Sequence, residues 1–270
     1  MILSMQKEYT GNCKDIINRY KNLFSSINVT AKTFNEMPNV DILGIKEDNR
    51  ELIWKSEMSI NVGKNSIILE VSDSLLVAMD SLSGNLITFP DQLLIQGEFK
   101  PEAFNFDHNF EWIHQPSENE GIFYYFEFDG FCDKVISHYE NVFDTKAVDV
   151  LTYNDVSGNM PGGEKIYDAS ISFTDGDKCF TIKLRDTFDS AQYNYDKYNP
   201  NALLFYKNHN PLLSIKSQDK TALESCFARL TAGAKLNKPM SKDEFGMLNG
   251  SLIDKYGICW DFSEVDLQRS

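Results

Sequence analysis

One stretch of the sequence occurs twice, 119 positions apart, since the copies begin at residues 11 and 130 (130 − 11 = 119). The segments 11–24 and 130–143 agree at six of fourteen positions: Gly11/Gly130, Cys13/Cys132, Ile17/Ile136, Tyr20/Tyr139, Asn22/Asn141 and Phe24/Phe143. Unrelated segments of this length share roughly one residue, so the agreement indicates an internal duplication. We therefore expect the same unit of structure to appear twice.

The repeated unit is predicted as one strand, one helix and three strands, over residues 4–72 and again over 122–186. In 12–24 the apolar residues recur at helical spacing and form one face. The last two strands of each unit flank a short turn that contains Gly63 in the first copy and Gly176 in the second. A glycine in such a short loop is typical of a tight hairpin.

A further unit follows the second copy. It is predicted as a strand at 211–216, a helix at 219–233 that begins at Asp219 and ends at Gly233, and two strands up to residue 262. After the first copy, residues 74–114 contain no clear amphipathic helix, and a polar linker follows at 115–121. We therefore predict two domains, an N-terminal one over 1–116 with an incomplete second module and a complete one over 117–270.

The net charge of −14 argues against nucleic acid and anionic membranes as partners, because both would be repelled. The acidic residues either form a solvated surface or attract a cationic ligand. No apolar run approaches the ~18 residues of a membrane span, and the first residues lack the apolar core of a signal peptide. The five cysteines are scattered, without a Cys-x-x-Cys pair, which favours reduced thiols in a cytoplasmic protein.

Several spaced motifs resemble one known family. Phe126-Glu-Phe-Asp-Gly-Phe-Cys132, Tyr139-Glu-Asn-Val-Phe143 and Leu151-Thr-Tyr-Asn-Asp155 resemble the opening of PhnB-like proteins of the vicinal oxygen chelate (glyoxalase/bleomycin-resistance/dioxygenase) superfamily. Leu230-Thr-Ala-Gly-Ala-Lys235 resembles the end of that family's second helix, and the glycines from Gly246 to Gly257 before Trp260 resemble its closing hairpin. The resemblance covers about 121–265 fully and 4–73 through the duplication.

The resemblance implies an α+β fold of tandem βαβββ modules, with a degenerate N-terminal copy, whose strands curl into a cup over a small-molecule pocket. Two-module relatives commonly pair as dimers. In this chain the duplication predicts an intramolecular pseudo-dimer whose two halves pack on each other, and it leaves a further homodimer open.

Enzymes of the superfamily hold a divalent metal through His, Glu or Gln on the first and last strands of the modules, where it serves as a Lewis acid. The resemblance places the first-strand positions near Tyr124 or Tyr125 and near Leu213 or Ser214, none of which is a usual ligand. Asp261 falls on the last strand where the enzymes carry Glu, Lys183 falls at the matching site of the second copy, and Glu70 falls there in the first. We therefore expect no metal and no other cofactor, with Asp261 as a ligand only if a metal is found.

Two repeated side chains allow a functional and a packing interpretation each. Cys13 and Cys132 recur at equivalent helix starts, either as thiols activated by the helix N-terminus or as small apolar residues beneath the sheet. Glu8 and Glu127 recur on the first strands, either as a general base in the cup or as outward-facing strand residues.

Three functions follow from these patterns. We predict a metal-free small-molecule-binding protein rather than an enzyme, with its pocket lined by Glu127, Arg185, Trp260 and Asp261. The first alternative is a metal-dependent glyoxalase-like lyase or dioxygenase that uses Asp261. The second is a protein that sequesters a cationic drug, as bleomycin-binding relatives do.

Overall fold

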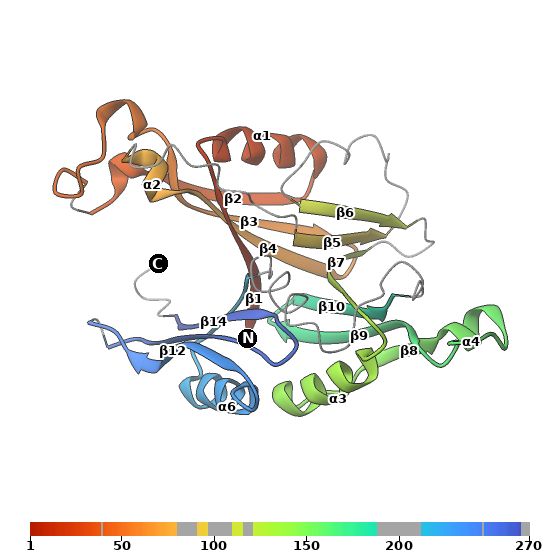
Figure 1. Cartoon of the computed structure of the whole chain (residues 1–270). Helices are drawn as coiled ribbons and strands as arrows, with labels where there is room; N and C mark the ends of the chain where they lie inside the picture. The colour runs from red at the N-terminus through yellow and green to blue at the C-terminus, as the bar shows by residue number, and fades with distance from the viewer. Residues whose placement is uncertain are drawn as a thin grey trace.

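The computed structural model describes residues 1–38, 40–79, 91–96, 110–115, 121–187, 212–244 and 246–265. The described strands form one mixed sheet of fourteen strands, and the longer helices lie on its outer sides (Figure 1). Between them lies one continuous core that draws residues from both ends of the chain.

The predicted duplication is confirmed by two units with the same elements. Module 1 consists of β1 (Ile2–Tyr9), α1 (Cys13–Leu23), β2 (Ile27–Thr33), β3 (Ile53–Val62) and β4 (Asn65–Asp73). Module 3 consists of β7 (Gly121–Phe128), α3 (Cys132–Phe143), β8 (Val148–Thr152), β9 (Ile166–Asp175) and β10 (Lys178–Asp186). In both modules the first strand pairs parallel with the fourth strand. The fourth strand pairs antiparallel with the third, and the third pairs antiparallel with the second.

The third predicted unit, module 4, also has this form. It consists of β11 (Leu212–Ser217), α6 (Lys220–Leu230), β12 (Lys235–Lys242), β13 (Leu248–Ile253) and β14 (Cys259–Glu264). The Asp219 carboxylate caps α6 by accepting a hydrogen bond from the Ala222 amide, as predicted. The segment between modules 1 and 3 contributes α2 (Leu75–Ala78), β5 (Asp91–Gln96) and β6 (Phe110–Gln115); we call β5 and β6 module 2.

The modules pair across the sequence. The first strand of module 1 pairs antiparallel with the first strand of module 4, with Ser4 opposite Ser214. Likewise β7 of module 3 pairs antiparallel with β5 of module 2. Modules 1 and 4 thus form what we call the terminal half of the sheet, and modules 2 and 3 the central half. The halves meet where Asn65 on β4 lies opposite Cys179 on β10. The pairing of β1 with β11 and the pairing of β5 with β7 each join residues from the two sides of the domain boundary expected at residue 116.

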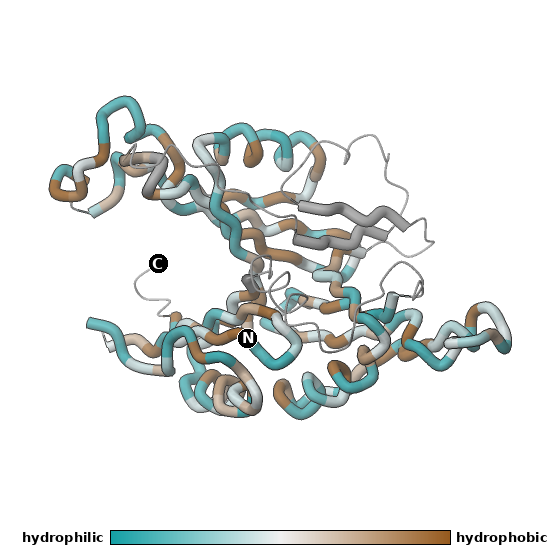
Figure 2. The backbone as a smooth tube through the Cα atoms, viewed as in Figure 1, coloured by the Kyte–Doolittle hydropathy of each residue, from teal (hydrophilic) through white to brown (hydrophobic). Residues whose placement is uncertain are grey.

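Alternation along the strands separates a core face from an open face. On β1, Leu3, Met5 and Tyr9 are buried in the core, while Ser4 and Glu8 point the other way. Helices α1 and α6 cover the core faces of modules 1 and 4, and Figure 1 shows them on opposite outer sides, so the open faces of the two modules are turned toward each other. Figure 2 shows hydrophobic and hydrophilic residues alternating along the strands of modules 1, 3 and 4.

The cysteines follow the packing interpretation. Cys13 and Cys132 are fully buried at the first turns of α1 and α3. Burial, followed by the charge of Asp73 beside one and Asp186 beside the other, raises the pKa of both thiols far above the ordinary value. A thiol that stays protonated is a poor nucleophile, so the helix starts do not activate these residues.

Candidate functional site

Five polar side chains meet on the open face of the terminal half, and we call them the cup cluster: Ser4 on β1, Glu70 on β4, Ser214 and Lys216 on β11, and Asp261 on β14. The sheet register sets three of them in a row, because Ser4 lies opposite Ser214 and Ser214 lies opposite Asp261. The cluster therefore joins residues more than 200 positions apart in the chain.

Glu70 is the centre of the cup cluster's hydrogen bonds. One oxygen forms an ion pair with the Lys216 ammonium at 2.6 Å, and the other accepts a hydrogen bond from the Ser4 hydroxyl. The two charged side chains are only 16% and 17% exposed, so water screens their attraction less than it would at the surface. Both carboxylate oxygens of Glu70 thus have a donor.

Asp261 and Ser214 are the unsatisfied members. Asp261 forms no hydrogen bond to any of the described residues. Burial, with a further contribution from the negative charge of Glu70, raises the pKa of Asp261 to about 6 against the opposing effect of Lys216. The hydroxyl of Ser214 is fully buried and has no partner within the described part of the chain. Buried polar groups are rarely left unpaired unless a ligand, ion or water completes them.

A groove of about 360 Å³ runs along β1, β4 and the adjoining part of β3. Its walls combine the acidic Glu8 and Glu70 with the basic Lys7 and Lys55 and with the ring of Trp54. Glu70 belongs to both the groove and the cup cluster, so a molecule in the groove can reach the cluster. Glu8, for which the sequence leaves a general base or an outward-facing strand residue open, is exposed and lies in the wall of this groove.

The donor set of the cup cluster does not suit the divalent metal that the fold family implies. It offers two carboxylates and two hydroxyls but no imidazole, and the first strands β1 and β11 contribute only Ser4 and Ser214 to it. The Lys216 ammonium already occupies one oxygen of Glu70 and would repel a second cation. Among the described residues, no three His, Cys, Asp or Glu side chains converge in a way that could hold a metal.

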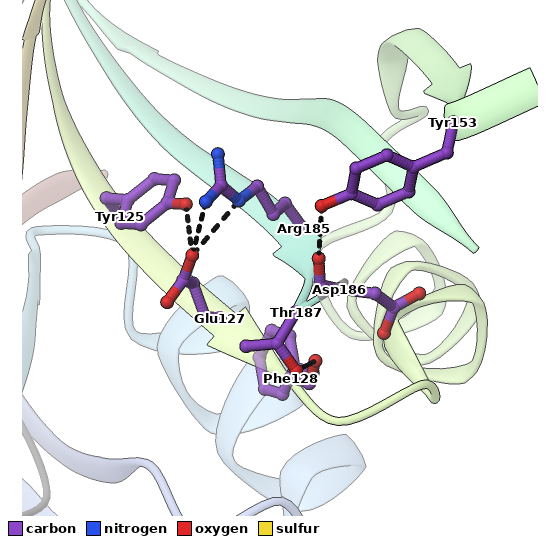
Figure 3. Close-up of polar contacts among 7 residues, drawn as sticks. All are labelled: Tyr125, Glu127, Phe128, Tyr153, Arg185, Asp186 and Thr187. Atoms are coloured by element: carbon purple, nitrogen blue, oxygen red, sulfur yellow. Dashed lines mark hydrogen bonds and ion pairs between the residues drawn. The ribbon is translucent and has the colours of Figure 1, made fainter. Parts of the chain in front are cut away.

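Two of the predicted pocket residues meet in the central half instead. The Arg185 guanidinium contacts one oxygen of Glu127 through Nη2 at 2.7 Å and Nε at 3.0 Å, and the Tyr125 hydroxyl donates to the same oxygen at 2.8 Å (Figure 3). Arg185 also lies over the Tyr125 ring. Nearby, Lys183 forms an ion pair with Asp168 at 2.5 Å. These charges are already paired with one another.

Trp260 belongs to neither cluster. It is fully buried on the core face of β14, where its ring packs against Tyr139 and Phe143 of α3. Its indole nitrogen donates to Asp254 at 2.9 Å. The expectation of one pocket lined by Glu127, Arg185, Trp260 and Asp261 is therefore corrected, because strand alternation turns Trp260 away from Asp261 and the module pairing puts Asp261 in the other half of the sheet.

Solved structures resemble this chain, although no protein-family model and no curated protein matches it. A single-residue variant of glyoxalase I from Zea mays superimposes on 97% of this chain and 94% of its own, with a TM-score of 0.54 and 9% identity. Protein PA1353 from Pseudomonas aeruginosa matches 52% of this chain over 93% of its own length, with 18% identity and a TM-score of 0.40. A PhnB protein from Bacillus cereus also matches 52% of this chain, over 96% of its own length, with 19% identity and a TM-score of 0.36.

The full-length likeness to the maize protein decides the fold. The chain has the tandem glyoxalase fold. The predicted resemblance to the vicinal oxygen chelate superfamily is thus confirmed for the fold, including the duplicated α+β arrangement of βαβββ modules. An identity of 9% carries no activity from the maize protein to this chain.

Proposed function

We propose that the chain binds a polar small molecule on the open face of its terminal half and does so without a divalent metal. The observation that carries this proposal is the buried Ser214 hydroxyl, which no described residue hydrogen-bonds, beside the half-buried Asp261 and near a groove that Glu70 helps to line. A ligand that hydrogen-bonds to both groups would remove the cost of leaving them unpaired.

The residues of the cup cluster favour binding over metal-dependent catalysis. Lys216 supplies the positive charge that balances Glu70, so the cluster needs no bound cation for that purpose. The alternative of a glyoxalase-like lyase or dioxygenase would require Asp261 and Glu70 to work with two serines in place of the usual ligands. We therefore rank that alternative below metal-free binding.

A cationic ligand is the second candidate, and the surroundings of Asp261 favour it. Glu70 is the charged group that acts most strongly on Asp261, although the groove itself is lined by Lys7 and Lys55 as well as by Glu8 and Glu70. A positively charged group next to Asp261 would lower the free energy of its ionised form. This candidate keeps the drug-sequestering alternative open.

The cytoplasmic setting remains part of the proposal. All five cysteines are free thiols in the structure, as a reducing compartment would keep them. No helix in the described ranges is both long and apolar enough to cross a membrane.

A ligand screen with matched variants tests the proposal. Thermal shift would be measured against a library of polar metabolites and cationic drugs, in the presence of EDTA, for the wild type, Ser214→Val, Asp261→Asn and the control Ser170→Ala. Ser170 is a buried serine of the central half, away from the groove. We expect a ligand that raises the Tm of the wild type and the control but not of the other two. A ligand that stabilises all four chains equally, or acts only when a divalent metal is supplied, would contradict the proposal.

A further inference from the structure

We propose that the groove beside the cup cluster takes a small zwitterion, a molecule in which a short apolar segment joins an ammonium group to a carboxylate. Glu8 holds the ammonium group, Lys55 holds the carboxylate, and the ring of Trp54 packs against the apolar segment. This inference rests on the proposed function, because the groove and the cup cluster share Glu70, and it names the chemical class of the ligand.

Two opposite charges in the walls of the groove are available to a ligand. Glu8 and Lys55 are both exposed, and neither forms an ion pair or a side-chain hydrogen bond with any described residue. The other charged residues of the walls differ, because Glu70 is paired with Lys216 and Lys7 is buried. The groove therefore offers a ligand one open carboxylate and one open ammonium.

The sheet register holds these two charges apart. Glu8 on β1 lies opposite Ser72 on β4. Ser56 on β3 lies opposite Val71 on β4, so the preceding residue of β3, Lys55, continues the row of Glu8 and Ser72. Strands β1 and β3 are two strand spacings apart, which is about 10 Å between their backbones. A molecule that lies between these walls with a charge at each end matches both of them.

A second lysine marks the cationic wall independently. Lys32 on β2 lies directly opposite Lys55 on β3, and both side chains are exposed. Neither lysine forms an ion pair with a carboxylate in the described part of the chain. Like charges directly opposite each other in a sheet are destabilising. An anionic group of a ligand relieves this repulsion, so this wall favours a carboxylate.

The duplicated module shows the same row with its charges satisfied. In module 3, Glu127 lies opposite Arg185 and forms an ion pair with it at 2.7 Å. Module 1 carries Ser72 at the strand position of Arg185, so its glutamate, Glu8, has no cation beside it on β4. The open carboxylate is thus a property of the terminal half and not of the repeated unit.

Trp54 provides an apolar surface between the charged walls. Its ring lines the groove and is backed by a small hydrophobic cluster of Phe34, Ile45 and Ala78. An apolar segment that packs on this ring is removed from water. The indole nitrogen is buried and has no hydrogen-bond partner among the described residues. Buried donors are normally satisfied, so the wall next to Lys55 favours an acceptor such as a carboxylate oxygen.

The test is isothermal titration calorimetry of the full chain with the common α-amino acids and with ε-aminocaproate. Each probe is compared with its N-acetyl derivative, which lacks the ammonium charge, and with its amide, which lacks the carboxylate charge. We expect at least one zwitterion to bind the wild type about tenfold or more tightly than either derivative, as the loss of a hydrogen bond to a charged group implies.

Variants of the two walls assign each end of the zwitterion. In Glu8→Gln we expect the zwitterion to bind no more tightly than its N-acetyl derivative. In Lys55→Met, alone or with Lys32→Met, we expect it to bind no more tightly than its amide. The matched controls Glu224→Gln and Lys64→Met remove exposed charges on α6 and in the turn after β3, and they should bind as the wild type does.

Three results would overturn the inference. The first is a zwitterion that binds the wild type and both wall variants with equal affinity. The second is a singly charged derivative that binds the wild type as tightly as its zwitterion. The third is the absence of binding by every zwitterionic probe, while another polar ligand binds through Ser214 and Asp261; this result would leave the proposed function intact. Failure of all zwitterions and of every other polar ligand would overturn both.

Discussion

Asp73 and Asp186 make the same hydrogen bonds in two modules, 113 residues apart (186 − 73 = 113). One oxygen of Asp73 accepts the Cys13 amide at 3.0 Å, and the other accepts the Ile53 amide at 2.9 Å. Asp186 accepts the Cys132 amide at 2.9 Å and the Ile166 amide at 3.0 Å in the same way. Each carboxylate thus ties the end of its fourth strand to the start of the helix and the start of the third strand.

We predict that Asp186→Ala lowers the free energy of unfolding by about 2 to 4 kcal/mol, because two buried backbone amides lose their acceptor. Asp73→Ala should have a similar effect in module 1. Urea denaturation followed by circular dichroism measures both. The control is Asp177→Ala in the exposed hairpin turn, which should change stability by less than about 0.5 kcal/mol. Losses at Asp73 and Asp186 no larger than this control would contradict the assigned role.

The elements of the fold were predictable because local signals determine them. The two strands predicted to flank the turn at Gly63 are observed at Ile53–Val62 and Asn65–Asp73, with Gly63 at a positive φ of 58° in the turn. Strand β12 was missed because its residues, such as Lys238 and Pro239, are polar or unsuited to a central strand, and they are tolerated at the sheet edge. The pairing of modules was not predictable, because it depends on contacts between β1 and β11 that no local pattern encodes.

The same limit explains the candidate site. The sequence indicated Asp261 and Glu70 as equivalent last-strand residues, but only the module pairing shows that they share one centre. Lys216 was missed because an isolated lysine on a short strand gives no signal of its partner 146 positions earlier (216 − 70 = 146). Glu127 and Arg185, which the sequence suggests as pocket residues, lie side by side, but they form an ion pair with each other.

Asp261 makes stability depend on pH. Its folded-state pKa of about 6 lies above the ordinary value of 3.8, so folding favours the protonated form. Its contribution to stability is therefore present below about pH 4 and is lost as the pH rises through 6. We predict that Asp261→Asn raises the free energy of unfolding at pH 8 by about 1 to 3 kcal/mol and changes it little at pH 4. Urea denaturation at both pH values checks this, and an equal destabilisation at both would disprove it.

The ion pair between Glu70 and Lys216 should show strong energetic coupling. We predict a coupling free energy of about 1 to 3 kcal/mol in a double-mutant cycle built from Glu70→Gln and Lys216→Met, because the pair is largely buried. The control cycle uses the ion pair between Glu140 and Lys146. Because Lys146 is 83% exposed, the coupling free energy of this pair should be below about 1 kcal/mol. Similar coupling in the two cycles would show that burial of the first pair has no energetic effect.

Trp260 should act on stability and not on ligand binding. Its indole and the Tyr139 hydroxyl, at 2.9 Å and 2.6 Å, both donate to the same oxygen of Asp254. We predict that Trp260→Phe costs about 2 kcal/mol through a lost hydrogen bond and a small cavity. The affinity of the folded variant for any ligand of the wild type should be unchanged. A tenfold loss of affinity with unchanged stability would instead place Trp260 in the binding site.

The most direct test of the account is the metal content of the purified wild-type protein, measured by elemental mass spectrometry before and after soaking in Mn²⁺, Ni²⁺, Zn²⁺ and Fe²⁺ and desalting. Because Lys216 neutralises Glu70 and the cup cluster offers no imidazole, we predict far less than one retained ion per chain. A retained ion close to one per chain, absent from Asp261→Asn and from Glu70→Gln, would contradict the metal-free account.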